Sequence, residues 1–122
     1  MVIRVWRTGL MPAQTAAYDA FVEEHSLPMF RALDGCLGAL FLRSETHGLV
    51  VSFWTTADAI AALEHAQRYA ATVKAIQAAG FLDDPQTVDC TDLKGGFLGE
   101  GVIAALAALS QAPGAAGAEP GQ

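Results

Sequence analysis

The stretch CLGALFLRSETHGLVVSFWT, residues 36–55, carries the clearest structural signal in this chain. Residues 36–45 and 48–55 are rich in apolar and β-branched side chains, and a short turn at residues 46–48 separates them. Two such runs joined by a tight, glycine-containing turn predict a β-hairpin. Both runs are apolar at consecutive positions, so we expect both faces of these strands to be covered by other parts of the protein.

One helix is expected before this hairpin and one after it. Residues 13–33 carry apolar side chains at steps of three and four, which predicts an amphipathic helix. Its inward stripe consists of Tyr18, Phe21, Val22, His25, Met29 and Leu33. Pro28 predicts a kink or break in this helix, because proline lacks a backbone donor and crowds the preceding turn. Residues 57–79 form the second predicted helix, which ends at Gly80.

Two further strands, residues 2–8 and 86–93, complete the pattern. The resulting order of strand, helix, strand, strand, helix and strand is that of a ferredoxin-like α+β domain (βαββαβ) with a four-stranded antiparallel sheet. The helices of this arrangement cover only one face of the sheet. The second apolar face therefore predicts a partner, and a second copy of the chain, giving a homodimer, is the simplest one.

The end of the chain is expected to lie outside this domain, which spans residues 1–95. Residues 96–110 form an extension with a short helix, rich in alanine and leucine, at residues 101–109. Residues 111–122 are of low complexity and predict a flexible tail.

The composition is that of a small globular protein. The 122 residues are enough for one domain, and 52% of them are hydrophobic against 16% charged. Seven basic residues are scattered among thirteen acidic ones, which gives a net charge of −6. Binding to nucleic acid or to an anionic membrane requires clustered Lys and Arg, so we expect neither partner.

The sequence also predicts a cytoplasmic location and no metal site. Arg4 and Arg7 interrupt the early apolar stretch, and no apolar run reaches about 18 residues. Cys36 and Cys90 lack metal-binding spacing, and we expect two buried free thiols rather than a disulfide.

Three motifs occur together in the predicted domain. They are the strand IRVWR at residues 3–7, the segments LPMFRALDG and GALFLR within residues 27–43, and the strand-to-helix junction SFWTTADAI at residues 52–60. A closing strand near Val88 follows them. Together they resemble the antibiotic-biosynthesis-monooxygenase-like group of dimeric α/β-barrel proteins, and the resemblance covers about residues 1–95.

This resemblance implies a dimeric α/β barrel that encloses a small-molecule pocket. Some members resemble cofactor-independent oxygenases that turn phenols or anthrones of polyketide pathways into quinones, and others degrade haem. The haem-degrading members carry an Asn on the first strand, and a Trp and a haem-ligating His on the second helix. Here the first strand has no Asn, and by register from Trp54 the Trp and His positions hold Leu63 and Val73, which weakens the haem hypothesis.

His25 is the candidate catalytic residue. It lies on the inward stripe between Val22 and Met29, so we expect it to point toward the sheet. A buried neutral imidazole can act as a base toward a phenolic proton. The alternative is a structural His that is bonded to a backbone carbonyl or to water.

Aromatic side chains are the candidate substrate contacts. Trp6, Trp54 and Phe41 can stack on a planar molecule, although each can instead belong to the core or to the dimer interface. Tyr69 is expected to turn inward from the second helix. A strand arginine such as Arg7 can bind a carboxylate or phenolate if it faces the interior.

We therefore predict a cofactor-independent monooxygenase, or a related small-molecule catalyst, that acts on an aromatic substrate with no cofactor. Two hypotheses stay open beside it. One is a non-catalytic small-molecule-binding or accessory protein of the same fold, and the other is a haem-binding or haem-degrading monooxygenase.

Overall fold

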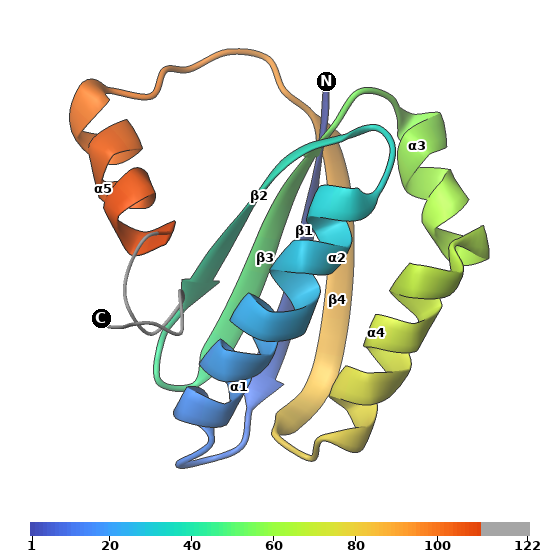
Figure 1. The fold of residues 1–122 in the computed structure, drawn as a ribbon, viewed down its shortest axis with the longest axis vertical. Helices are drawn as coiled ribbons and strands as arrows, with labels where there is room; N and C mark the ends of the chain where they lie inside the picture. Colours follow the sequence, from blue (N-terminus) through green and yellow to red (C-terminus); the bar gives the residue numbers. More distant parts are fainter. Residues whose placement is uncertain (111–122) are drawn as a thin grey trace.

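The computed structural model describes residues 1–110 and contains a four-stranded antiparallel sheet (Figure 1). The strands are β1 (Val2–Leu10), β2 (Cys36–Arg43), β3 (His47–Trp54) and β4 (Leu82–Asp92). Their spatial order is β2-β3-β1-β4, and every neighbouring pair is antiparallel. This is the ferredoxin-like α+β arrangement, so the fold prediction is confirmed.

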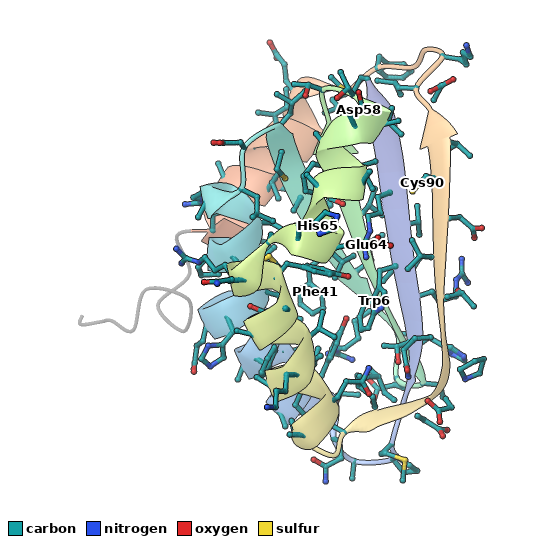
Figure 2. The ribbon with its side chains drawn as sticks, turned by 90° about the vertical axis from the view of Figure 1, so that its right-hand side faces the viewer. Trp6, Phe41, Asp58, Glu64, His65 and Cys90 are labelled. Carbon is teal, nitrogen blue, oxygen red and sulfur yellow. The ribbon has the colours of Figure 1, made fainter. Side chains whose placement is uncertain are left out.

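Two helical stretches cover one face of the sheet. The first consists of α1 (Thr15–Phe21), the π-helical turn η1 (Val22–Ser26) and α2 (Leu27–Ala32). The second consists of α3 (Ala57–Ala61), the 3-10 turn η2 (Ala62–His65) and α4 (Gln67–Ala78). Figure 2 shows both stretches on the same side of the strands.

The second helical stretch is broken at Ala66, which corrects the continuous helix expected over residues 57–79. Ala66 is extended, with φ −86° and ψ 115°, and separates η2 from α4. The Thr56 hydroxyl accepts a hydrogen bond of 3.2 Å from the backbone nitrogen of Ala59 and so caps α3. Neither Gly nor Pro occurs near Ala66, so the sequence pattern did not reveal the break.

The core lies between the helices and the sheet. On β3 every second residue from Gly48 to Trp54 is buried under the helices. One core cluster holds Leu10, Tyr18, Val22, Ile76 and Phe81. The other holds Met29, Phe30, Val50, Trp54 and Leu63.

The opposite face of the sheet, which we call the open face, is apolar over β2, β3 and most of β1, and polar at Arg7 and along β4, where it carries Thr87, Asp89 and Thr91. Its apolar side chains, all half-buried or exposed, are Ile3, Val5, Leu40, Leu42, Leu49, Val51 and Phe53. Directly opposed residues of antiparallel strands share a face, so the row Leu40, Val51 and Val5 runs across three strands. The two helical stretches leave this surface uncovered.

The last described element is α5 (Glu100–Ser110), which matches the helix expected at residues 101–109. All of its residues are exposed. They include the apolar side chains Val102, Ile103, Leu106 and Leu109. Within residues 1–110, no helix has the length and hydrophobicity needed to cross a membrane. The tail expected at residues 111–122 lies outside the described residues.

Both cysteines are free thiols. Cys36 is half-buried, and burial raises the pKa of its thiol. Cys90 is exposed (Figure 2), so the prediction of two buried thiols is wrong for this residue. The reason is its place on β4, which is an edge strand of the sheet.

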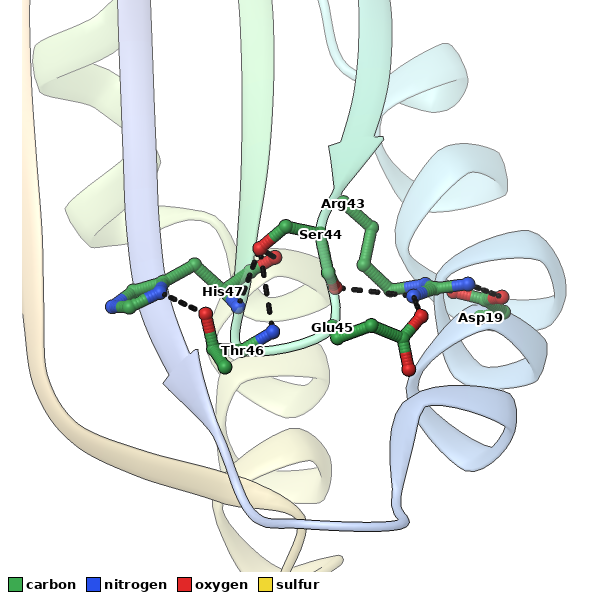
Figure 3. Close-up of polar contacts among 6 residues, drawn as sticks. All are labelled: Asp19, Arg43, Ser44, Glu45, Thr46 and His47. Atoms are coloured by element: carbon green, nitrogen blue, oxygen red, sulfur yellow. Dashed lines mark hydrogen bonds and ion pairs between the residues drawn. The ribbon is translucent and has the colours of Figure 1, made fainter.

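Arg43, the last residue of β2, forms an ion pair with Asp19 of α1. Its guanidinium donates to both carboxylate oxygens of Asp19, with Nε–Oδ1 at 2.6 Å and Nη2–Oδ2 at 3.1 Å (Figure 3). Inside the turn, the Ser44 hydroxyl accepts hydrogen bonds from the backbone nitrogens of Thr46 and His47. The turn between β2 and β3 is therefore fixed by local polar contacts.

Candidate functional site

A pocket lies between the sheet and the two helical stretches. Its floor comes from β1 and β3, one wall from η1 and α2, and the other wall from α4. The lining residues are Arg4, Trp6, Val22, Ser26, Met29, Phe30, Val50, Tyr69, Thr72, Val73 and Ile76. The free space inside is about 50 Å³. An engineered cavity that accepts benzene has about 150 Å³, so the pocket in this conformation is narrow.

Arg4 and Tyr69 form the polar centre of the pocket. Arg4 is only 5% exposed, and its Nη2 donates a hydrogen bond of 2.8 Å to the Tyr69 hydroxyl. The guanidinium carbon lies 5.5 Å from the centre of the Tyr69 ring, which is a cation–π distance. Both ion pairs found in residues 1–110 belong to Arg43, so no described carboxylate neutralises Arg4.

Strand alternation explains why Arg4 enters the pocket and Arg7 does not. Arg4 and Trp6 lie two residues apart on β1 and share the helix-covered face. Arg7 is exposed on the open face and lines a separate hollow near the hairpin turn. The prediction that Arg7 contacts substrate in the pocket is therefore corrected. Sequence reasoning missed Arg4, although its spacing from Trp6 was a usable signal.

Tyr69 reaches the pocket because α4 starts a new helical direction after Ala66. It is half-buried and lines the pocket, which confirms that it turns inward. His65 belongs to η2 and is exposed (Figure 2). The two residues therefore lie on different helical segments.

His25 points away from the sheet, which corrects the prediction that it faces the pocket. It is exposed, and its ring packs on Phe21 with 4.8 Å between ring centres. The cause is the π-helical η1, in which each turn takes in more residues than an α-helical turn. The wide turn places Ser26 on the buried side instead, and Ser26 lines the pocket. The irregularity expected around Pro28 is present as η1, directly before it in the chain.

Trp6 is the one of the three predicted aromatic contacts that lines the pocket. Trp54 is fully buried, and its Nε1 donates a hydrogen bond of 2.8 Å to the Ser52 hydroxyl. Phe41 packs edge-on against Tyr18, with 5.5 Å between ring centres. Figure 2 shows Trp6 and Phe41 on the helix-covered side of the sheet. Trp54 and Phe41 are thus core residues outside the pocket wall.

The pocket can hold a flat apolar molecule with one polar or negatively charged group. Trp6 and Phe30 offer ring surfaces, and Arg4 offers the guanidinium donors that Tyr69 does not use. Among the lining residues there is no imidazole, carboxylate or thiol. In the described part of the chain, no three His, Cys, Asp or Glu side chains gather as a metal site.

No family model matches the sequence, and no curated protein sequence matches it. Solved structures do match. NE2512 from Nitrosomonas europaea, a protein of unknown function, is 22% identical with a TM-score of 0.66, and the match covers 80% of this chain and 93% of that chain. A monooxygenase from the gene ActVA-Orf6 of Streptomyces coelicolor, solved with nanaomycin D, is 17% identical with a TM-score of 0.67, covering 81% and 92%. SnoaB, a cofactor-independent oxygenase from Streptomyces nogalater, is 15% identical with a TM-score of 0.63, covering 78% and 94%.

The chain shares the fold of the antibiotic biosynthesis monooxygenases. At these identities the likeness shows the antibiotic biosynthesis monooxygenase fold alone. The chemistry of this chain has to be argued from its own pocket residues.

Proposed function

We propose that this protein is a cofactor-independent oxygenase that acts on a planar phenolic or polyketide-like molecule. The observation that carries the proposal is the Arg4–Tyr69 pair at the centre of an otherwise largely apolar pocket. Two proteins of the same fold support it, because SnoaB is a cofactor-independent oxygenase and the ActVA-Orf6 monooxygenase binds nanaomycin D.

The pocket residues suit a reaction that passes through a substrate anion. The Arg4 guanidinium and the Tyr69 hydroxyl stabilise the anion of a phenolic or enolic oxygen placed beside them. That anion donates electrons to O₂. In an anthrone, one oxygen atom of O₂ ends in a C=O group at the former CH₂ carbon. The other oxygen atom leaves as water with the two hydrogens of the CH₂ group. The substrate supplies every electron that this reduction of O₂ requires. The lining residues include no imidazole or carboxylate, so we expect the proton that the substrate loses when it forms this anion to pass to water.

Oxygen consumption with an anthrone as substrate tests the proposal. We expect one O₂ to be consumed for each quinone formed. An oxygen electrode measures the O₂ consumed, and absorbance measures the quinone. Arg4→Met should lower kcat/KM by about a hundredfold, because it removes a donor that stabilises the anion. Tyr69→Phe should lower it less, since the charge remains.

Two control variants sharpen this test. Arg31→Met removes an exposed charge from α2, and His25→Ala removes the exposed imidazole of η1, so both should keep full activity. No oxygen uptake by the unaltered protein, or equal turnover in Arg4→Met, contradicts the proposal. Circular dichroism of each variant establishes that the comparison is made between folded proteins.

Non-catalytic binding is the second candidate function. It is favoured by one observation, namely that the described pocket wall holds no general base such as His, Asp or Glu. A binder is expected to unfold at a higher temperature when the anthrone is added, with no quinone and no oxygen uptake.

Haem binding has less support from the pocket. Val73 lines the wall at the position that register assigns to the haem-ligating His, and Leu63 is buried in the core. We expect titration with haem to give no shift of the Soret band.

We also propose that the protein works as a cytoplasmic homodimer joined through the open face. The row Leu40, Val51 and Val5 is a contiguous apolar surface, and such surfaces are commonly interaction sites. Pairing of two identical faces about a twofold axis closes the assembly at two copies.

A further inference from the structure

Arg4 is a buried cation that the described chain does not neutralise. It is 5% exposed, and neither of the ion pairs within residues 1–110 includes it. Burying a charge without an opposite charge costs free energy, because the ion loses its hydration. The Tyr69 hydroxyl replaces part of that hydration but carries no charge. An anion bound beside Arg4 would therefore offset the free-energy cost of burying this positive charge.

The geometry of the pair leaves donors available to such an anion. A guanidinium has five N–H donors, and Tyr69 takes one of them. The Tyr69 oxygen accepts that bond, so its own proton is directed elsewhere and can be donated to a ligand. A carboxylate or phenolate oxygen beside the pair can thus receive charge-assisted hydrogen bonds from Arg4 and one from Tyr69.

We propose that the pocket selects ligands that carry an anionic oxygen, a carboxylate or a phenolate, on a planar aromatic ring system. The anionic oxygen lies against Arg4 and Tyr69, and the ring lies against the apolar lining residues. This inference rests on the proposed function only for the place of the site, and it holds whether or not the ligand is turned over.

An aromatic ligand requires the pocket to widen. The free space is about 50 Å³, whereas an engineered apolar cavity that binds benzene has about 150 Å³. Met29, an unbranched and flexible side chain of the wall, is suited to that movement. A fused three-ring molecule requires the helical walls to separate further.

Benzoate and benzamide form a matched pair of probes. They have nearly the same shape, and only benzoate is an anion. We expect benzoate to bind the full chain in calorimetry at millimolar concentration and to raise its Tm, and benzamide to bind at least about tenfold more weakly, since hydrogen bonds to charged groups are the stronger ones.

The variants separate charge from shape. Arg4→Met should weaken benzoate binding by about tenfold or more and leave benzamide binding nearly unchanged. Arg4→Lys keeps the charge without the forked donors and should fall between the two. Arg31→Met, on the exposed side of α2, should bind benzoate as the unaltered chain does.

A coloured phenol reports on the same site by a second readout. 4-Nitrophenol turns yellow when it ionises, so at a pH below its own pKa the protein should increase the yellow fraction, and Arg4→Met should not.

Three results would overturn the inference. They are no binding of benzoate by the unaltered chain, equal binding of benzoate and benzamide, and benzoate binding that survives Arg4→Met. A failure of the oxygenase proposal looks different, because benzoate would still bind while the anthrone gives neither quinone nor oxygen uptake.

Discussion

The hydroxyl of Tyr18 is the clearest energetic anomaly at the scale of single residues. The side chain is fully buried, and its oxygen has no hydrogen-bond partner in the part of the chain that the structure describes. Gly48 makes room for it, because a Cβ at that position would lie 2.5 Å from the Tyr18 oxygen. A buried polar group without a partner reduces stability.

Tyr18→Phe should therefore stabilise the protein. Removing an unpaired buried hydroxyl is expected to raise the free energy of unfolding by about 1–3 kcal/mol, measured by urea denaturation. Gly48→Ala is the opposite variant at the same contact, and it should lower the free energy of unfolding because its methyl group clashes with the ring. A lower stability for Tyr18→Phe would show that the hydroxyl has a partner in solution.

The same residue makes stability depend on alkaline pH. Burial, and secondly the nearby Asp19 charge, raise the pKa of Tyr18 above its ordinary value of 10.0. The folded protein keeps the phenolic proton where the unfolded chain loses it, so the free energy of unfolding should fall as the pH rises above 10.0. In Tyr18→Phe this part of the fall should disappear, which paired denaturation curves at neutral and alkaline pH would reveal.

At the scale of elements, the two α-helices of the second helical stretch begin in different ways. Thr56 caps α3 through its hydroxyl, whereas α4 begins at Gln67 with no side-chain cap. The start of α3 is therefore sensitive to one side chain, and the start of α4 depends on packing.

Thr56→Ala should lower the free energy of unfolding by about 1 kcal/mol, because it leaves the Ala59 backbone nitrogen without its acceptor. Thr56→Ser keeps a hydroxyl at the cap and should restore most of the loss. Equal stabilities of the Ala and Ser variants would contradict the capping role. Thermal and urea unfolding of the three proteins make the comparison.

The sequence predicted the order of the elements and the hairpin with its turn at residues 46–48, because hydrophobic periodicity and glycine turns are local signals. It predicted an irregularity around Pro28, but neither the π-helical form of η1 nor the break at Ala66, since both depend on how the helices fit the sheet. These two irregularities determine which side chains line the pocket. They turn His25 outward, bring Ser26 inward and aim Tyr69 at Arg4. The candidate site was therefore predicted only at Trp6 and Tyr69.

At the scale of the whole molecule, two apolar surfaces stay exposed within the described residues. One is the open face of the sheet, and the other is α5, whose residues make no substantial contact with the domain. Figure 1 shows α5 standing apart beside β2. The net charge of −6 favours solubility without covering either surface.

Val51→Lys should convert the proposed dimer into a monomer, because it places a charge at the centre of the open face. Light scattering after gel filtration gives the mass directly. A chain that ends at residue 95 keeps the open face and lacks α5, and it should remain dimeric. A monomeric unaltered protein, or a dimer that Val51→Lys leaves intact, would rule out this interface.

The wide turn of η1 also bears on how this scaffold tolerates changes of length. Losing a residue from a regular helix swings everything after it by about 100° around the axis. Here the surplus lies in the π-helical turn itself, so a chain without Glu24 can tighten that turn to α-helical pitch while the segments on both sides keep their orientation. Deletion of Glu24 should therefore leave Ser26 and Met29 in the pocket wall near Arg4. Titration of the shortened protein with benzoate measures whether the pocket is kept.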